Sequence, residues 1–207
     1  MPRVVPEYKE EAKSRILEAA NQGFAEKGYR QATMEDVAKK INVSKGALYQ
    51  YYSSKEDLFE AICRNEPTIL KNITYTTFIE NRDPIESASI FFDKMIHRYG
   101  PPHHQGLQFE ILSEASHNLV LRKILRKTQD EYVEVLSNFL TQLQQREFIS
   151  KELDVHTITY TIIAMWNGIE TLVVSGLSLP VAKKAWLIGF QKIFLPQQER
   201  SIISPRK

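Results

Sequence analysis

Four lysines and several hydroxyl-bearing side chains lie close together in the first third of the chain. Ammonium and hydroxyl groups bind phosphate oxygens, and lysine also reaches the acceptor atoms of guanine in the major groove. This composition favours nucleic-acid binding, although a solvated lysine face would have the same composition. The segment from Val37 to Lys55 holds no acidic residue and four lysines, Lys39, Lys40, Lys45 and Lys55.

Three helix starts would position these side chains. Thr33 fits an N-cap with Asp36 three residues on, and apolar residues then recur on one helical face. After a short turn, Ser44 can cap a second helix from Lys45 to Tyr51, and Ser54 can cap a third, whose first amides can bind a phosphate. This order predicts a helix-turn-helix whose second helix reads DNA in the major groove.

The charge of the whole chain is much more balanced than the charge of this segment. The chain carries a formal net charge of only +2, with a pI near 8.5. A protein that binds nucleic acid tightly without sequence preference is usually far more basic. The balance therefore favours a site-specific binder that gains affinity from geometry and dimerisation.

A longer pattern runs from Ile16 to Ile62, about a quarter of the chain. It contains Ala19, Phe24, Gly28 and Tyr29 in the first helix, followed by the blocks SKGALY and SKEDLF. At this spacing the segment resembles the tetracycline-repressor (TetR) family of bacterial and archaeal transcriptional regulators. The resemblance implies an all-α homodimer with a three-helix DNA-binding domain and a C-terminal domain that dimerises and usually holds an inducer.

The resemblance also implies roles for single residues. Lys45 and Gly46 would lie at the floor of the major groove, where glycine allows close approach. Ala47 would offer at most a contact to a thymine methyl group, and Gln50 would either pair with adenine or face solvent. Ser44 belongs to this DNA-binding set as the cap of the reading helix. Phosphate contacts, which set the register without reading sequence, are implied for Thr33, Tyr49, Tyr51 and Lys55.

Two positions depart from the usual family pattern, and one residue lies outside it. Tyr51 stands where histidine is common and Tyr52 where phenylalanine is common, and both keep an aromatic ring. For Tyr52, packing in the small core is favoured over a DNA contact. Arg3, in the N-terminal arm, would either enter an adjacent minor groove or belong to a frayed end.

The helical pattern and the resemblance predict an N-terminal helix-turn-helix DNA-binding domain and a C-terminal helical ligand-binding and dimerisation domain. Pro67 interrupts an apolar stripe because it cannot donate to the carbonyl of Cys63. We expect a kink or break there, either as a hinge or as a proline that opens a separate helix. The predicted parts are a DNA-binding domain (residues 1–53), a connecting region (54–82), the C-terminal domain (83–196) and a tail (197–207).

The last two helices are the predicted dimer interface. Their apolar residues exceed what a solvent-exposed pair would carry, and Gly168, Gly176 and Gly189 permit close helix approach. We expect the same residues to serve an intrachain core as well. From Pro84 onward the expected helices are Pro84 to Gly100, His103 to Glu114, Asn118 to Arg146, Val155 to Ser175 and Pro180 to Leu195.

An inducer pocket is expected among the helices between Pro84 and Ser175. Its lining would suit an apolar or amphipathic small molecule, although each aromatic residue would equally serve the core. Asn167 and Glu170 are polar residues one turn apart on an apolar helix; Glu170 would orient a ligand, pair across the dimer or reach solvent. The predicted lining is Phe91, Met95, Tyr99, Phe109, Leu112, Tyr132, Phe139, Tyr160, Met165, Trp166, Asn167 and Glu170.

Four histidines raise the question of a metal site, because histidine with a nearby carboxylate such as Glu110 or Glu114 can bind zinc. Their spacing matches no firm metal motif, and adjacent histidines beside a Pro-Pro turn are typical of exposed loops. We therefore predict no metal and no other cofactor. The histidines are His97, His103, His104 and His117.

Other classes of protein are disfavoured. The sequence has no phosphate loop, dinucleotide-binding turn, nucleophile elbow or metalloprotease histidine pair, so no enzyme is predicted. Cys63 is the single cysteine, which excludes an internal disulfide and fits a reducing cytoplasm. There is no signal-peptide core and no membrane-spanning apolar run. We expect a cytoplasmic protein.

The sequence thus predicts a homodimeric repressor that binds a pseudo-palindromic operator in double-stranded DNA and is released by a small-molecule inducer. The alternative is a helix-turn-helix protein that acts without a ligand or under the control of a partner.

Overall fold

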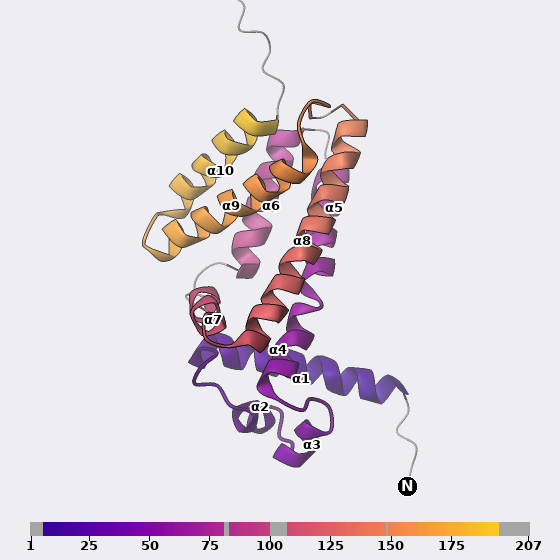
Figure 1. Cartoon of the computed structure of the whole chain (residues 1–207), viewed down its shortest axis with the longest axis vertical. Helices are drawn as coiled ribbons and strands as arrows, with labels where there is room; N and C mark the ends of the chain where they lie inside the picture. Colours follow the sequence, from indigo (N-terminus) through magenta and orange to yellow (C-terminus); the bar gives the residue numbers. More distant parts are fainter. Residues whose placement is uncertain (1–5, 81–82, 100–106, 148, 195–207) are drawn as a thin grey trace, which may run out of the picture. The chain divides into compact units, whose positions relative to one another are not determined.

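The computed structural model describes residues 6–80, 83–99, 107–147 and 149–194, and the elements within them are all α-helices (Figure 1). The predicted all-α fold class is confirmed. None of the described helices is long and apolar enough to cross a membrane. The helices are α1 (Pro6–Lys27), α2 (Met34–Lys40), α3 (Lys45–Tyr49), α4 (Lys55–Cys63), α5 (Glu66–Glu80), α6 (Pro84–Tyr99), α7 (Leu107–Ala115), α8 (Leu119–Gln145), α9 (Val155–Val174) and α10 (Leu179–Phe194).

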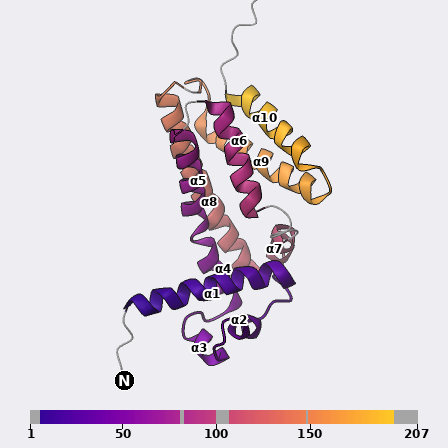
Figure 2. The same cartoon turned by 180° about the vertical axis from the view of Figure 1, so that it is seen from behind.

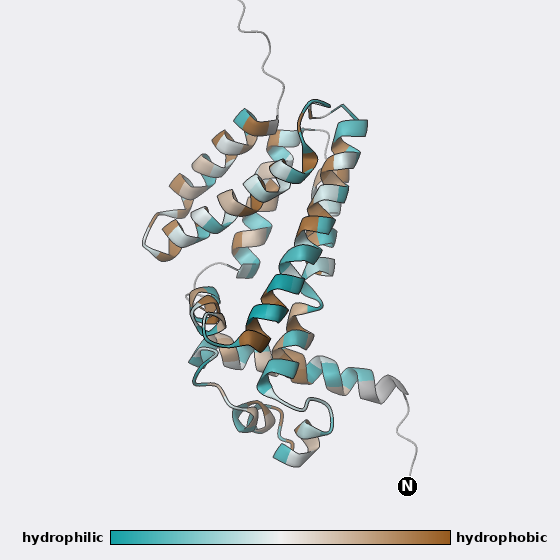
Figure 3. Cartoon of the chain, in the orientation of Figure 1, coloured by the Kyte–Doolittle hydropathy of each residue, from teal (hydrophilic) through white to brown (hydrophobic). Residues whose placement is uncertain are grey.

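The chain divides into two compact units. The first comprises residues 1–69 and 99–132, so it joins helices α1 to α4 with α7 and the first half of α8. The second comprises residues 70–98 and 133–207, and so contains most of α5, together with α6, the rest of α8, α9 and α10. Hydrophobic and hydrophilic positions alternate along α8 (Figure 3), as expected of a helix that buries one face.

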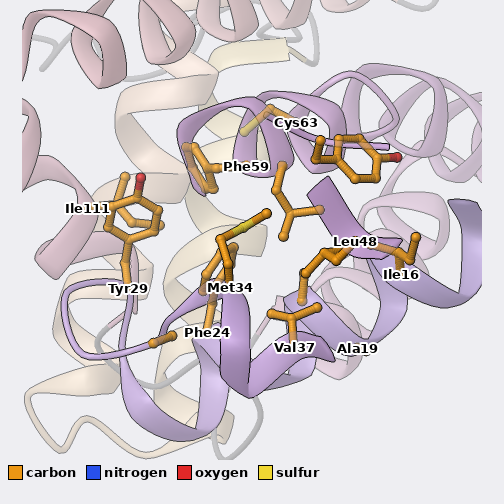
Figure 4. Packing of buried hydrophobic residues seen from close by; sticks show 14 of the residues in the cluster. Ile16, Ala19, Phe24, Tyr29, Met34, Val37, Leu48, Phe59, Cys63 and Ile111 are labelled. Atoms are coloured by element: carbon orange, nitrogen blue, oxygen red, sulfur yellow. The ribbon is translucent and has the colours of Figure 1, made fainter. Parts of the chain in front are cut away.

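One apolar cluster holds the first unit together (Figure 4). The ring centroids of Phe24 and Phe59 each lie 5.3 Å from that of Tyr29. Leu48 of α3 is completely buried, and Ile111 of α7 lies in the same cluster. Helix α7 therefore shares its core with the predicted helix-turn-helix, although the two are far apart in the sequence.

Aromatic side chains form the core of the second unit. Trp186 of α10 is 2% exposed, and its ring stacks on Phe91 of α6 at a centroid distance of 5.7 Å. Its indole Nε1 donates to the carbonyl of Ala88 at 2.8 Å, which satisfies the buried polar group. Helices α9 and α10 lie side by side (Figures 1 and 2), and Trp166 of α9 meets Trp186 edge to face. These rings fill the space between α6, α9 and α10.

The interruption expected near Pro67 is a break between two helices. Helix α4 ends at Cys63, and α5 begins at Glu66 with the amide of Ile69 bonded to the carbonyl of Asn65 at 3.1 Å. Pro67 thus occupies the first turn of α5, where an amide hydrogen would have no acceptor within its own helix. The separate-helix alternative is confirmed, whereas the hinge stays a prediction.

The predicted helix ends agree with the structure within a few residues. The reading helix stops at Tyr49, two residues before the predicted end, since the next amides bond back to Ala47 and Leu48. The predicted N-cap at Asp154 is confirmed. Gly100, His103, His104, Leu195, Pro196 and the predicted tail (197–207) lie outside the described residues.

Candidate nucleic-acid interface

Buried residues fix α2 and α3 against the core of the first unit. Val37 of α2 and Leu48 of α3 are at most 1% exposed, so both helices are anchored through their inner faces. At the start of α2, the Thr33 hydroxyl accepts from the Asp36 amide at 3.2 Å, and the Asp36 carboxylate accepts from the Thr33 amide at 3.0 Å. Asn42, in the turn, adopts a φ of 56°, which asparagine tolerates. The predicted capping box and turn are confirmed.

The two following helix starts are also capped by the predicted serines. The Ser44 hydroxyl accepts from the Ala47 amide at 3.1 Å, and the Ser54 hydroxyl accepts from the Asp57 amide at 3.0 Å. These bonds fix where α3 and α4 begin. Leu48 anchors one side of α3 to the core. The point at which the helix starts then determines which other side chains of α3 face outward.

The outer face of α3 presents Lys45, Gly46, Tyr49 and Gln50, all exposed, while Ala47 is half-buried. The Lys45 ammonium lies 6.0 Å from the centroid of the Tyr49 ring. A Cβ built on Gly46 would meet no heavy atom nearer than 4.0 Å, so packing within the chain does not require glycine there. The face thus combines a cation, a missing side chain and an amide, which suits close approach to base edges.

The other lysines of the basic segment are more constrained than Lys45. Lys39 pairs with Glu35 at 2.8 Å and Lys40 with Glu26 at 2.7 Å. The hydrogen bond from Lys39 lowers the pKa of Glu35 below its ordinary value. Within the described part of the chain, Lys45 makes no ion pair. Its charge is therefore the most available for a DNA contact.

Lys55 is bound to the backbone of the turn between α1 and α2. Its ammonium donates to the carbonyls of Tyr29 at 2.8 Å, Arg30 at 3.3 Å and Ala32 at 3.2 Å. It also lies 4.5 Å from the centroid of the Tyr29 ring. The sequence did not indicate this structural role, because its partners lie more than twenty residues earlier. The predicted phosphate contact of Lys55 stays a prediction.

The remaining predicted phosphate contacts differ in how accessible they are. Tyr49 is 44% exposed, whereas Tyr51 is half-buried and packs against the core cluster. The Thr33 hydroxyl donates to the Asp36 carboxylate at 2.7 Å in addition to capping α2. Tyr52 is 7% exposed, as expected of the core role, and burial raises the pKa of its hydroxyl. Arg3 lies outside the described residues.

The residues predicted to line an inducer pocket do not all lie in one unit. Tyr99, Phe109, Leu112 and Tyr132 belong to the first unit and the rest to the second. In the second unit Trp166 contacts the rings of Phe91 and Phe92, at centroid distances of 6.3 and 6.0 Å. The other predicted lining residues of this unit differ in exposure. Met95 and Phe139 are buried, Met165 and Glu170 are half-buried, and Tyr160 and Asn167 are exposed. Burial raises the pKa of Glu170 to about 7.

The carboxylates considered for metal binding have other partners. Glu110 accepts hydrogen bonds from two backbone amides of the first unit, those of Tyr29 and Arg30. Glu114 lies 3.7 Å from the Arg30 guanidinium. Among the described residues no group of three or more His, Cys, Asp and Glu side chains could hold a metal ion. The role of Glu110 in the turn had no signal in the sequence, because some 80 residues separate the partners.

Comparison with known proteins agrees with this geometry. Residues 16–62 match the family model described as bacterial regulatory proteins, tetR family. The chain is 32% identical over 151 residues to YfiR of Bacillus subtilis (strain 168), an uncharacterised HTH-type transcriptional regulator. That match covers 71% of this chain and 73% of YfiR. The shared region therefore extends well beyond the helix-turn-helix.

Solved structures show the same fold over most of the chain. A protein from Rhodococcus sp. assigned to the TetR family of transcriptional regulators has a TM-score of 0.77 at 21% identity, over 89% of this chain and 99% of that one. The fatty acid degradation regulator FadR from Bacillus halodurans has a TM-score of 0.70 at 22% identity, over 84% and 95%. The helix-turn-helix, the shared sequence and the shared fold lead to one conclusion: this chain belongs to the TetR family and is a DNA-binding transcriptional regulator.

Proposed function

We propose that the chain is a homodimeric repressor that binds a pseudo-palindromic operator through α3 and is released by an apolar or amphipathic small molecule. The observation that carries the proposal is the outer face of α3. Leu48 anchors the helix, while Lys45, Gly46, Tyr49 and Gln50 face outward. Lys45 would read guanine acceptors beside Gly46, and Tyr49 would hold a phosphate.

Dimerisation is supported by exposed apolar residues on α9 and α10. Tyr160, Leu172, Val181 and Ile188 are between 43% and 53% exposed. Hydrophobic positions recur along both helices in Figure 3. A second copy of the chain would cover this surface, and two reading helices would then meet two half-sites related by the same two-fold symmetry.

Of the three glycines predicted to permit close helix approach, Gly168 supports the same assignment. A Cβ on Gly189 of α10 would collide with the Met165 sulfur of α9, so this glycine serves packing within the chain. A Cβ on Gly168 of α9 would meet nothing within 4 Å, and Gly168 is exposed. Glycine at position 168 would therefore allow close approach of a partner helix. Gly176 has a φ of 105° and ends α9, so its role is conformational.

The inducer part of the proposal rests on the chemistry of the second unit. Trp166 on α9 is a half-buried apolar side chain, and Glu170 is a half-buried carboxyl one turn from it. A ligand with an apolar body and one polar group would suit these side chains. Such a ligand releases DNA only if it binds one dimer geometry better than the other. The proposed set is completed within the second unit by Met95, Tyr160, Met165 and Asn167.

Substitutions in α3 should separate DNA reading from stability. Lys45→Ala should cost about 1–3 kcal/mol of specific binding and relax the sequence preference. Gly46→Ala should weaken specific binding while raising the free energy of unfolding by about 0.5–1 kcal/mol, because alanine favours the helix. Duplex sites are first selected from a random library. Binding to them is then measured by fluorescence anisotropy. Lys39→Ala removes an equal charge outside α3 and should have a smaller effect; an equal loss would contradict the assignment.

Lys55→Ala should lower both stability and DNA affinity. The free energy of unfolding should fall by about 1–3 kcal/mol, because three carbonyls of the turn lose a charged donor. If Lys55 also holds a phosphate, affinity should fall for all sequences and the salt slope of binding should decrease by about 1. Urea unfolding and salt titration measure the two effects separately. An unchanged unfolding midpoint would contradict the structural role.

Charged substitutions on α9 and α10 should break the dimer. Leu172→Glu and Ile188→Glu should each give a monomer, because a carboxylate would be buried at the interface. Native mass spectrometry of gently purified protein measures the mass, and also detects any small molecule that denaturation releases. Leu112→Glu alters a residue that is equally exposed in the first unit and should leave the dimer intact. The proposed interface would be contradicted if the wild-type protein were monomeric on its selected DNA. The ligand-independent alternative would be favoured by a ligand-free dimer whose DNA binding responds to no added compound.

A further inference from the structure

The carboxylate of Glu110 is bound to the turn that connects α1 to α2. Its Oε2 accepts from the Tyr29 amide at 3.0 Å, and its Oε1 accepts from the Arg30 amide at 2.7 Å. Glu110 lies in the first turn of α7, where it could have capped its own helix. Instead both oxygens face two consecutive amides of another segment. Charge-assisted bonds of this kind are stronger than bonds between neutral groups.

The conformation of the turn is adapted to this carboxylate. Gly28 has a φ of 78°, a left-handed conformation that glycine adopts readily, and this directs the next two amides to one side. A Cβ at position 28 would collide with Oε2 of Glu110. On the carbonyl side of the same turn, the Lys55 ammonium binds Tyr29, Arg30 and Ala32. The turn is thus held by an anion on its amides and by a cation on its carbonyls.

Helix α7 is itself firmly attached to the first unit. Ile111, next to Glu110, is 7% exposed and lies in the same cluster as Tyr29 (Figure 4). At the corner between α7 and α8, Arg122 donates to the carbonyls of Ala115 at 3.1 Å and Ser116 at 2.6 Å. The position of the Glu110 carboxylate is therefore set by a packed helix, and a shift of α7 would break both of its amide bonds.

We propose that Glu110 is a positioning residue for sequence reading by α3. It acts through the turn, since Ala32 directly precedes Thr33, the cap of α2, and α2 leads into α3 through the turn at Asn42. Loss of the carboxylate frees the Tyr29 and Arg30 amides, and the start of α2 then has more than one position. The inference rests on the proposed reading of DNA by α3. It adds that a residue outside the helix-turn-helix, and without DNA contact of its own, sets the specificity.

Specific and non-specific affinity separate this role from simple stabilisation. Non-specific binding depends on the charges that meet the phosphates, whereas specific binding requires α3 in one orientation. A positioning residue changes the ratio of the two affinities. A residue that only stabilises the fold lowers both affinities together, in proportion to the folded fraction.

The test compares Glu110→Gln, Glu110→Asp and the control Glu114→Gln in the full-length protein. Glutamine keeps the shape of Glu110 but presents one acceptor and one donor to two amides; aspartate keeps the charge but is too short to reach both. Glu114→Gln removes a carboxylate from the same helix that meets Arg30 only at 3.7 Å. Affinity is titrated on the selected site and on a scrambled duplex, well below the unfolding temperature, and hydrogen exchange is followed at the Tyr29 and Arg30 amides.

Both Glu110 variants should lose about tenfold in specific affinity, with the scrambled duplex bound as by wild type. Exchange at the Tyr29 and Arg30 amides should accelerate in both, and Glu114→Gln should resemble wild type. Specific binding equal to wild type in Glu110→Gln would overturn this inference alone. So would a parallel loss on both duplexes. Absence of any sequence preference in the wild-type protein would overturn the proposed function, and this inference with it.

Discussion

The turn from Gly28 to Ala32 is the point on which the DNA-binding unit depends. Its amides are bound by Glu110 and its carbonyls by Lys55, so groups of opposite charge hold the two polar sides of one short segment. Within the turn the Ala32 amide donates to the Gly28 carbonyl at 3.2 Å, and backbone groups without such a partner must be satisfied from elsewhere. Here the partners come from α7 and α4. Because the turn ends at the cap of α2, these two side chains define where the helix-turn-helix begins.

Features that depend on near neighbours could be predicted from the sequence. The caps at Thr33, Ser44 and Ser54 each bond an amide three residues ahead, and all three are confirmed. The break at Pro67 follows from a missing amide hydrogen. The early end of α3 at Tyr49 was missed, because helical spacing continues to Tyr52, whose ring packs in the core after the helix has ended.

Features that depend on distant residues could not be predicted. The ammonium group of Lys55 is of the kind that binds phosphate, but its three partners are carbonyls more than twenty residues earlier. Glu110 was considered only as a neighbour of histidines. Aromatic residues in the second unit raised a similar problem, since Trp166 suits a pocket and a core equally well. Its contacts with Phe91 and Phe92 come from a helix some 75 residues away, and no local pattern encodes them.

In the proposed complex, two copies of α3 related by two-fold symmetry read DNA through Lys45. Hydroxyl-radical footprinting of the wild-type protein on its selected duplex tests this most directly. We expect two protected stretches in symmetric half-sites, about one helical turn apart or a multiple of it. Guanine methylation at N7 in either half-site should interfere with binding. A single, asymmetric footprint that is insensitive to guanine methylation would contradict the claim.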